Sequence, residues 1–490
     1  MVESMKHLLT LVLLAWILPS LHAAKPNFVF LLGDDINRDS LGCYGNVDCP
    51  TPHIDKLVKD GVKFNKAYTS VAMCAPFRQE LYSGRTAWRT KAFLNHSNSV
   101  PDTKSLPHYL KPLGYRVGLT GKTHIGPRTS YPFEYLGDGS KPDSNSFLLG
   151  KAKEFIGSCR KEEKPFCLVI ASHDAHSPYT NGDRSVFDPA KLTIPPYWID
   201  TPELRKALVP YYAEVANFDA LAGAIRSYLD ESDLANDTIF FVCTEQGSAF
   251  PFAKWTCFDN GLHTGLVAYG PGIVPKGHVS EELFWLCDVA PTMIDAAGGK
   301  MTKGFFDGRS QYANLTGKPT QVHDFVIGQF SNKGIIDNND RIYPIRCIRD
   351  DRYSFIWSPN HEQITSNVSL SKALALINGE TPRANKPGKE FPAASWVEAA
   401  KGPPLENPLI RKLNRRPEFA LYDLQKDPHE LNDLAADPKH KKTINRLRDQ
   451  LFSWLEQRDD ADPIATERAI TKNKAKKPNK KRPKQKGPNK

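Results

Sequence analysis

The feature that most constrains the fold is a series of five short, mostly apolar segments separated by stretches with helical spacing. The segments are Asn27–Leu32, Arg116–Thr120, Phe166–Ala171, Thr238–Thr244 and Gly265–Tyr269. Strands that are apolar on both faces and alternate with helices are typical of a parallel sheet that is covered on both sides. The sequence therefore predicts an α/β fold with one large, mostly parallel sheet sandwiched by helices.

The remaining sequence predicts one long helix and, late in the chain, a change to shorter secondary-structure elements. The helix is expected over Pro202–Leu229, with Thr201 as its N-cap. After about residue 335 the segments are shorter: strand-like Arg341–Ile348 and Tyr353–Trp357, then a helix near Lys442–Gln457. We expect a catalytic domain over residues 25–335 and a smaller C-terminal α+β subdomain over residues 336–462.

Both ends of the chain differ from the globular part. Residues 1–24 contain Lys6, the apolar run Leu8–Leu18 and the small pair Ala23-Ala24, a pattern typical of a cleaved signal peptide. We expect export to a periplasmic, extracellular or lysosomal setting, with no membrane span after cleavage; an uncleaved anchor is the alternative. Residues 463–490 are rich in Lys and Pro, and we expect a disordered basic tail there.

The net charge of +10 is concentrated in that tail. Residues 471–490 hold nine Lys, one Arg and no acid, and without them the chain has 55 basic and 55 acidic residues. Because the folded part is formally neutral, nucleic acid is not an expected partner. The tail has two interpretations: a solvated end without a partner, or a segment that contacts acidic polysaccharide through clustered Lys.

Oxygen-bearing side chains follow two of the predicted strands. Ligand sites in parallel sheets lie beyond the carboxyl ends of the strands. Asp34-Asp35 follow the first apolar segment and Glu245-Gln246 follow the fourth. Taken alone, Asp34-Asp35 would be explained by a helix N-cap. Together, the two pairs supply enough oxygens for a hard divalent cation such as Ca²⁺ or Mg²⁺.

Basic side chains follow the other strand ends. Lys122 and His124 come after the second segment, and His176 comes after the third. A single histidine in such a place is more often structural, but two beside a lysine favour a site for an anion. Lys254 lies close enough to Glu245 in the sequence to face the same site.

The most specific motif is Cys74-Ala75-Pro76-Phe77-Arg78. Pro76 and Gly84 frame a short helix that begins at Cys74. The free N–H groups and the dipole at a helix N-terminus favour an anionic ligand. Cys74 is one of nine cysteines, an odd number. As a bare thiol it is also compatible with a structural role.

The chain resembles the sulfatase family over nearly the whole mature sequence. Cys74–Arg78 fits the C-x-P-x-R signature in which that family's cysteine is oxidised to formylglycine. Further stretches match in order: Thr51–Asp55, Gly114-Tyr115 with Gly121–His124, Leu421–Leu424 and Asp427–Glu430. The resemblance implies an alkaline-phosphatase-like fold, hydrolysis of sulfate groups, and a formylglycine-generating or equivalent maturation enzyme as a partner.

The resemblance also implies a metal site. One Ca²⁺ would be bound by Asp34, Asp35, Glu245, Gln246 and the formylglycine made from Cys74. The family usually has Asp followed by Asn or His where this chain has Glu245-Gln246. The longer side chains would still reach the cation.

The other site residues take their implied roles from the same comparison. Arg78 would steady the formylglycine, and Lys122 and Lys254 would hold sulfate oxygens. His176 would protonate the leaving group, and His124 would remove the proton that lets sulfate depart.

Three stretches within the family most resemble the sulfamidases: Gly121–Pro127 with Tyr131–Phe133, His173–His176 and Tyr343–Arg346. Asp174 matches a position near the amino sugar and is the expected specificity residue, whereas Lys254 stands where sulfamidases have Arg. We therefore expect a sulfated carbohydrate substrate, with a sulfamidase-like activity on a glycosaminoglycan favoured. The alternatives are an O-sulfatase of another polysaccharide, a phosphate or phosphonate monoester hydrolase, and a non-catalytic binder of sulfated glycan.

Overall fold

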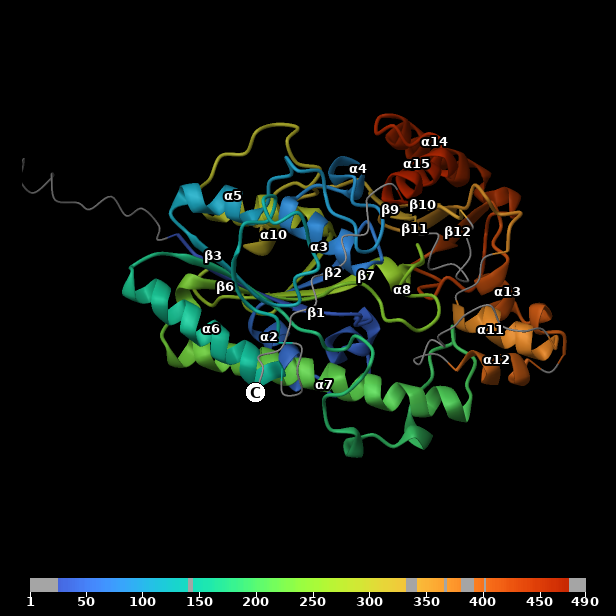
Figure 1. Ribbon diagram of the computed structural model, residues 1–490, viewed down its shortest axis with the longest axis horizontal. Coiled ribbons are helices and arrows are strands. Elements are labelled where there is room, and N and C mark those ends of the chain that lie inside the picture. Colours follow the sequence, from blue (N-terminus) through green and yellow to red (C-terminus); the bar gives the residue numbers. More distant parts are fainter. Residues whose placement is uncertain are drawn as a thin grey trace, which may run out of the picture.

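Two sheets form the framework of the computed structural model, which describes residues 25–139, 144–331, 342–364, 368–379, 392–400 and 402–475. The larger sheet has eight strands and the smaller has four (Figure 1). The expected signal peptide, residues 1–24, lies outside the described residues. Within the described ranges, no helix combines the length and the apolar character that a bilayer crossing requires.

The large sheet has the strand order β4-β3-β5-β1-β6-β7-β2-β8. Its strands are β1 (Asn27–Gly33), β2 (Val62–Tyr68), β3 (Arg116–Gly121), β4 (Glu134–Gly137), β5 (Phe166–Ala171), β6 (Thr238–Thr244), β7 (His263–Tyr269) and β8 (His278–Trp285). The five predicted segments are β1, β3, β5, β6 and β7. Only β7 runs antiparallel to its neighbours, so the prediction of a mostly parallel α/β sheet is confirmed.

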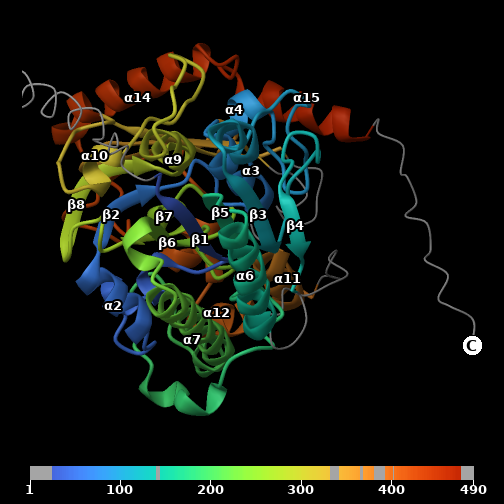
Figure 2. The same cartoon turned by 90° about the vertical axis from the view of Figure 1, so that its left-hand side faces the viewer.

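The centre of this sheet is buried on both faces, which explains why its strands are continuously apolar. Leu31 of β1 pairs with Ile170 of β5 on one side and with Val242 of β6 on the other, and all three are buried. One face is covered by α2 (Pro52–Asp60), α6 (Ser144–Lys161) and α7 (Pro202–Glu231), and the other by α3 (Cys74–Ser83), α5 (Leu106–Leu110) and α9 (Val289–Ala296) (Figures 1 and 2).

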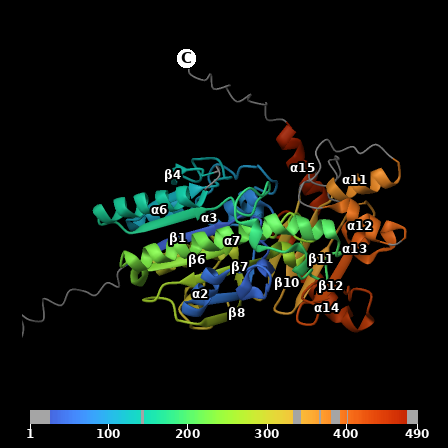
Figure 3. The same cartoon turned by 90° about the horizontal axis from the view of Figure 1, so that it is seen from below.

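Helix α7 confirms the predicted long helix and its cap. The Thr201 side chain accepts a hydrogen bond from the backbone N–H of Leu204, as an N-cap does. Leu204 and Leu208, one turn apart near the start of the helix, are both buried. Figure 3 shows α6 and α7 lying along the sheet, with the smaller sheet beside its end.

The smaller sheet is antiparallel, with the order β12-β11-β10-β9. Its strands are β9 (Val326–Phe330), β10 (Ile345–Arg349), β11 (Tyr353–Trp357) and β12 (Phe419–Asp423). Helix α14 (Lys441–Glu456) packs on β10 and β11. Because β9 pairs with β10, this sheet begins before residue 335, where we had expected the domain boundary. The remaining α-helices are α4 (Ala87–Thr90), α8 (Asp259–Leu262), α10 (Tyr312–Leu315), α11 (Val368–Ile377), α12 (Ala393–Ala399) and α13 (Pro408–Asn414).

Residues 463–475 form helix α15 (Pro463–Ala475), whereas we had expected the disordered tail to start at residue 463. The carboxylate of Asp462 accepts a hydrogen bond from the N–H of Ala465 at the start of this helix. Glu467 is buried and Ile470 packs against the core. Burial of this side of the helix accounts for the difference. Residues 476–490, which hold most of the basic tail, lie outside the described residues.

Candidate active site

Neighbouring strand ends bring the predicted acidic residues together. Gly33 at the end of β1 is paired with Thr244 at the end of β6, so Asp34 and Glu245 emerge side by side. Asp34, Asp35, Cys74 and Glu245 are all buried and offer ligand atoms within 4.8 Å of one another. The predicted convergence of these residues is thus present in the structure.

Gln246 joins this cluster and leaves one oxygen without a partner. Its Nε2 donates to Asp35 Oδ1 at 2.5 Å and lies 3.6 Å from the Cys74 sulfur. Gln246 Oε1 and Asp34 Oδ1 are buried and make no hydrogen bond. Unsatisfied buried oxygens are rare in native proteins unless an ion or water supplies the missing partner. Carboxylate and amide oxygens are the donors that Ca²⁺ prefers, so the residues present fit such a cation.

Arg78, in the second turn of α3, holds Glu245 of this acidic cluster in place. Its Nε donates to Glu245 Oε1 at 2.7 Å, its Nη2 to Glu245 Oε2 at 3.2 Å, and its Nη1 to the Lys122 carbonyl at 2.7 Å. Burial raises the pKa of the Glu245 carboxyl, but the charge of the Arg78 guanidinium and its two hydrogen bonds lower it and stabilise the carboxylate form. The guanidinium therefore ties the end of β6 to the loop after β3.

Two lysines neutralise the paired aspartates. Lys122 forms an ion pair with Asp34, and the Lys254 Nζ lies 2.7 Å from Asp35 Oδ2. The formal charges cancel among three acids and three bases: Asp34, Asp35, Glu245, Arg78, Lys122 and Lys254. Adding a divalent cation would leave an excess of positive charge. Such an excess suits an anionic substrate.

Cys74 lies at the start of α3, as predicted, and is 1% exposed. Burial alone would raise the pKa of its thiol. Lys254, Lys122 and a hydrogen bond with His176 outweigh burial and lower that pKa to about 5. The same positive surroundings would stabilise an anionic oxygen on this side chain.

The two predicted histidines have opposite protonation preferences. The Asp35 carboxylate, 3.7 Å from His176 Nε2, raises the pKa of His176 to about 9 against the effect of burial. Burial, followed by the charge of Lys122, lowers the pKa of His124 to about 3. At neutral pH His176 is therefore protonated and His124 is neutral. Groups whose environments push their pKa values apart suit the acid and base roles of one reaction.

Asp174, the expected specificity residue, is buried. Its carboxylate oxygens accept hydrogen bonds from Asn181 Nδ2 at 2.9 Å and from Asn217 Nδ2 at 2.8 Å. Its backbone carbonyl accepts from the N–H of Asp34 at 2.7 Å. The residue thus supports the loop that carries Asp34, and a contact with the sugar stays a prediction.

The sequence did not point to His96, which also reaches the site. Its Nδ1 lies 2.7 Å from His124 Nε2, and the two rings are 4.5 Å apart. His96 lies in an irregular segment after α4, without a motif, so only its neighbourhood in space identifies it.

Comparison with known proteins identifies the family of the chain. Residues 26–299, more than half of the chain, match the family model for sulfatases. The chain belongs to the sulfatase family. The resemblance expected from the sequence is therefore confirmed, and with it the assignment to a family of sulfuric ester hydrolases.

This sulfatase is similar to curated relatives along most of its length. It is 29% identical to an ulvan-active sulfatase of Formosa agariphila, over 89% of this chain and 81% of that relative. It is 26% identical to human N-sulphoglucosamine sulphohydrolase, over 88% of this chain and 90% of that relative. The predicted alkaline-phosphatase-like fold is also confirmed. A solved structure of Ps i-CgsB with k-i-k-neocarrahexaose covers 91% of this chain and 98% of its own, with a TM-score of 0.67 at 16% identity.

Proposed function

We propose that this sulfatase removes sulfate groups from a sulfated carbohydrate, using formylglycine made from Cys74 and one bound Ca²⁺. The observation that carries the proposal is the position of Cys74. It lies at a helix N-terminus, among three carboxylates and beside the cationic side chains of Lys254 and Lys122. The two curated relatives named above act on ulvan and on N-sulphoglucosamine, which favours a glycan substrate.

Formylglycine made from Cys74 would, as its hydrate, supply one hydroxyl as the nucleophile toward sulfur and a second whose deprotonation would release sulfate. Asp34, Asp35, Glu245, Gln246 and residue 74 would hold Ca²⁺, which would supply positive charge that favours the ionised form of such a hydroxyl. Because Cys74 is only 1% exposed, we propose that the maturation enzyme modifies it before the chain folds.

The remaining side chains bind the substrate and move protons. Lys122 and Lys254 hold the sulfate oxygens and neutralise the charge that builds on them. His176, protonated at neutral pH, donates its proton to the departing oxygen or nitrogen of the sugar. His124, neutral at that pH, accepts the proton released when sulfate leaves. Arg78 keeps Glu245 in place.

We favour an amino sugar as the sulfated unit, in a glycosaminoglycan-type chain. The sulfamidase-like stretches and the similarity to N-sulphoglucosamine sulphohydrolase support this choice. Asp174 would act on the sugar through Asn181 and Asn217, to which it is hydrogen bonded. Export through the signal peptide and contact of the basic tail with acidic polysaccharide are further parts of the proposal.

The test compares the wild type with Cys74→Ala, each co-expressed with a formylglycine-generating enzyme. The wild type should hydrolyse an aryl sulfate, and Cys74→Ala should lose at least about a thousandfold in kcat/KM while its circular dichroism is unchanged. A panel of N-, 2-O-, 3-O- and 6-O-sulfated disaccharides then identifies the position cleaved.

Three outcomes would overturn the proposal. Full activity of Cys74→Ala would show that residue 74 is not the nucleophile. Faster hydrolysis of an aryl phosphate would favour the phosphate or phosphonate ester alternative. Tight binding of a sulfated glycan by a folded protein without turnover of any sulfated probe would favour a binding protein.

A further inference from the structure

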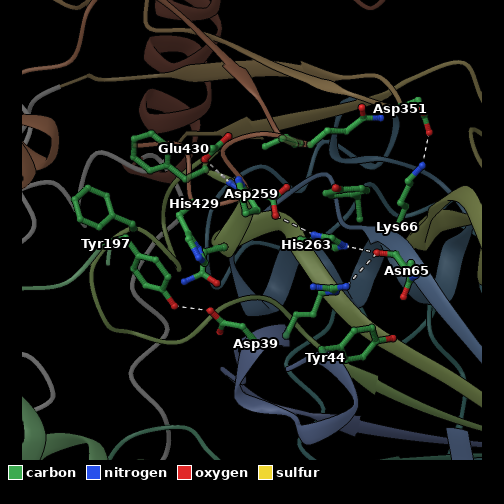
Figure 4. Close-up of a pocket in the computed structure, with 18 of the residues that line it drawn as sticks. Asp39, Tyr44, Asn65, Lys66, Tyr197, Asp259, His263, Asp351, His429 and Glu430 are labelled. Carbon is green, nitrogen blue, oxygen red and sulfur yellow. Dashed lines mark hydrogen bonds and ion pairs between the residues drawn. The ribbon is translucent and has the colours of Figure 1, made fainter. Parts of the chain in front are cut away.

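A second cavity of about 410 Å³ lies beside the large sheet, apart from Cys74 (Figure 4). Pockets that bind small molecules usually measure about 300–1,000 Å³. The walls come from the segment after β1, from β2, from the loop between β6 and β7, and from the C-terminal segment that ends in His429 and Glu430. None of the side chains assigned above to catalysis or metal binding lines it.

The cavity shares one wall with the active site. The loop between β6 and β7 carries Gln246 and Lys254 toward Cys74. The same loop contributes Phe252 and Asn260 to the second cavity. Both sites therefore lie along the edge where β1 and β6 end and β7 begins, with a single loop between them.

The lining combines aromatic rings with planar polar groups. Tyr44, Tyr68 and Phe258 are among the rings of the wall. Among the polar groups, Tyr197 donates to Asp39 at 2.5 Å, as Figure 4 shows. Rings pack against the C–H face of a sugar, and carboxylates and amides bond its hydroxyls. The lining thus matches the chemistry of a pyranose ring.

The cavity and the active site differ in the charge of their lining. Its lining contains five carboxylates against three Lys or Arg side chains. This excess of negative charge disfavours a sulfated unit. A metal ion is not the expected ligand either. Over the described ranges, the acidic and thiol groups close enough to hold one are those around Cys74.

We propose that this cavity binds an unsulfated sugar unit of the polymeric substrate while a sulfated unit occupies the Cys74 site. This inference rests on the proposed function, because it takes the substrate to be a glycan chain. Holding a second unit of the same chain converts encounter with the active site into an intramolecular step. Long glycans therefore gain affinity that a monosaccharide or an aryl sulfate does not.

Two variants test the cavity directly. His429→Ala removes an exposed lining side chain whose ring lies 5.3 Å from that of Tyr197. Gln425→Trp fills the cavity from another exposed lining position. His440→Ala is the matched control, since this histidine also contacts a tyrosine ring, that of Tyr353 at 6.2 Å, but lies outside the cavity.

Binding is measured on Cys74→Ala protein by saturation-transfer NMR, with fully desulfated hexasaccharides of heparin and of ulvan as probes. We expect at least one probe to bind. Each cavity variant should weaken it by about fivefold or more, and His440→Ala should leave it unchanged. No binding by folded protein, or binding that neither cavity variant alters, would overturn the inference.

Kinetics give a second readout. In otherwise wild-type enzyme, the cavity variants should leave aryl sulfate turnover unchanged and raise the KM for a sulfated hexasaccharide by about tenfold. An unchanged KM in both variants would contradict the inference. If the wild type cleaves no sulfate ester at all, the proposed function fails, and the binding experiment still tests the cavity.

Discussion

The guanidinium of Arg78 and the carboxylate of Glu245 form a two-pronged ion pair in which neither side chain is exposed. The same glutamate offers a ligand atom to the cluster of Asp34, Asp35 and Cys74. Glutamate is one methylene longer than the aspartate that sulfatases usually carry here. The longer side chain lets one carboxylate contact Arg78 and the cluster at once.

Replacing Arg78 should destabilise the protein because it leaves a buried charge unpaired. We expect Arg78→Met to lower the free energy of unfolding by about 3–5 kcal/mol. The double variant Arg78→Met with Glu245→Gln should recover part of this loss, since no unpaired charge remains. Urea unfolding measures both. A double variant no more stable than the single one would contradict the argument.

Glu245 should also set the affinity for the cation. We expect Glu245→Gln to weaken Ca²⁺ binding by about tenfold or more, because one negative ligand is lost. Titration calorimetry on chelator-treated protein gives this value without reference to turnover. Glu281→Gln, in the second cavity, serves as the control. Equal Ca²⁺ affinity in wild type and Glu245→Gln would remove Glu245 from the metal site.

Lys254 should control the ionisation of the unmodified Cys74 thiol. Against the opposing effect of burial, Lys254 contributes most to the low pKa of about 5. In protein made without the maturation enzyme, Lys254→Met should raise this pKa, and Lys412→Met, at a half-buried lysine away from Cys74, should not. The pKa of Cys74 is measured from the ultraviolet absorbance of its thiolate as a function of pH, after the absorbance of the Cys74→Ser variant is subtracted. An unshifted titration in Lys254→Met would show that the two groups do not interact.

Glu214 predicts a pH dependence of stability. Its carboxylate accepts hydrogen bonds from the N–H groups of Thr180 and Asn181, and burial raises its pKa from 4.5 to about 7. Between these values the folded chain keeps a proton that the unfolded chain has released. The contribution of Glu214 to stability is therefore full below 4.5 and is lost as pH rises through 7.

Glu214→Gln should remove this loss. We expect the variant to be more stable than wild type at about pH 8, by up to about 3 kcal/mol, and similar to it at about pH 4. Urea unfolding at the two pH values checks the difference. A wild type and variant with parallel pH profiles would assign the dependence to other groups.

The apolar segments made the centre of the large sheet predictable, because strands buried on both faces need continuous apolar side chains. The carboxyl ends of parallel strands meet at one edge of the sheet, so the residues after β1 and β6 could be predicted to lie close together. This reasoning placed Asp34 near Glu245. Strand β2 was missed because polar residues interrupt its sequence, VKFNKAY, where it lies next to the edge strand β8. The antiparallel direction of β7 follows from its pairing with β6 and β2 and leaves no trace in its composition.

Parts of the site depend on tertiary structure and escaped prediction for that reason. Asp35 and His124 have φ values of 57° and 47°, in the left-handed region that non-glycine residues rarely adopt. Such backbone is held by its surroundings and is common at functional sites. The carboxylate of Asp174 is hydrogen bonded to Asn181, seven residues further along the chain, and to Asn217 of α7. His96, in a loop without regular structure, contacts His124.

The most direct test of the account is the mass of the peptide that contains Cys74, taken from protein that hydrolyses an aryl sulfate. The account predicts an aldehyde in place of the thiol, in a fraction that rises in proportion to kcat across preparations with different degrees of maturation. Active protein in which Cys74 is entirely an unmodified thiol would contradict it.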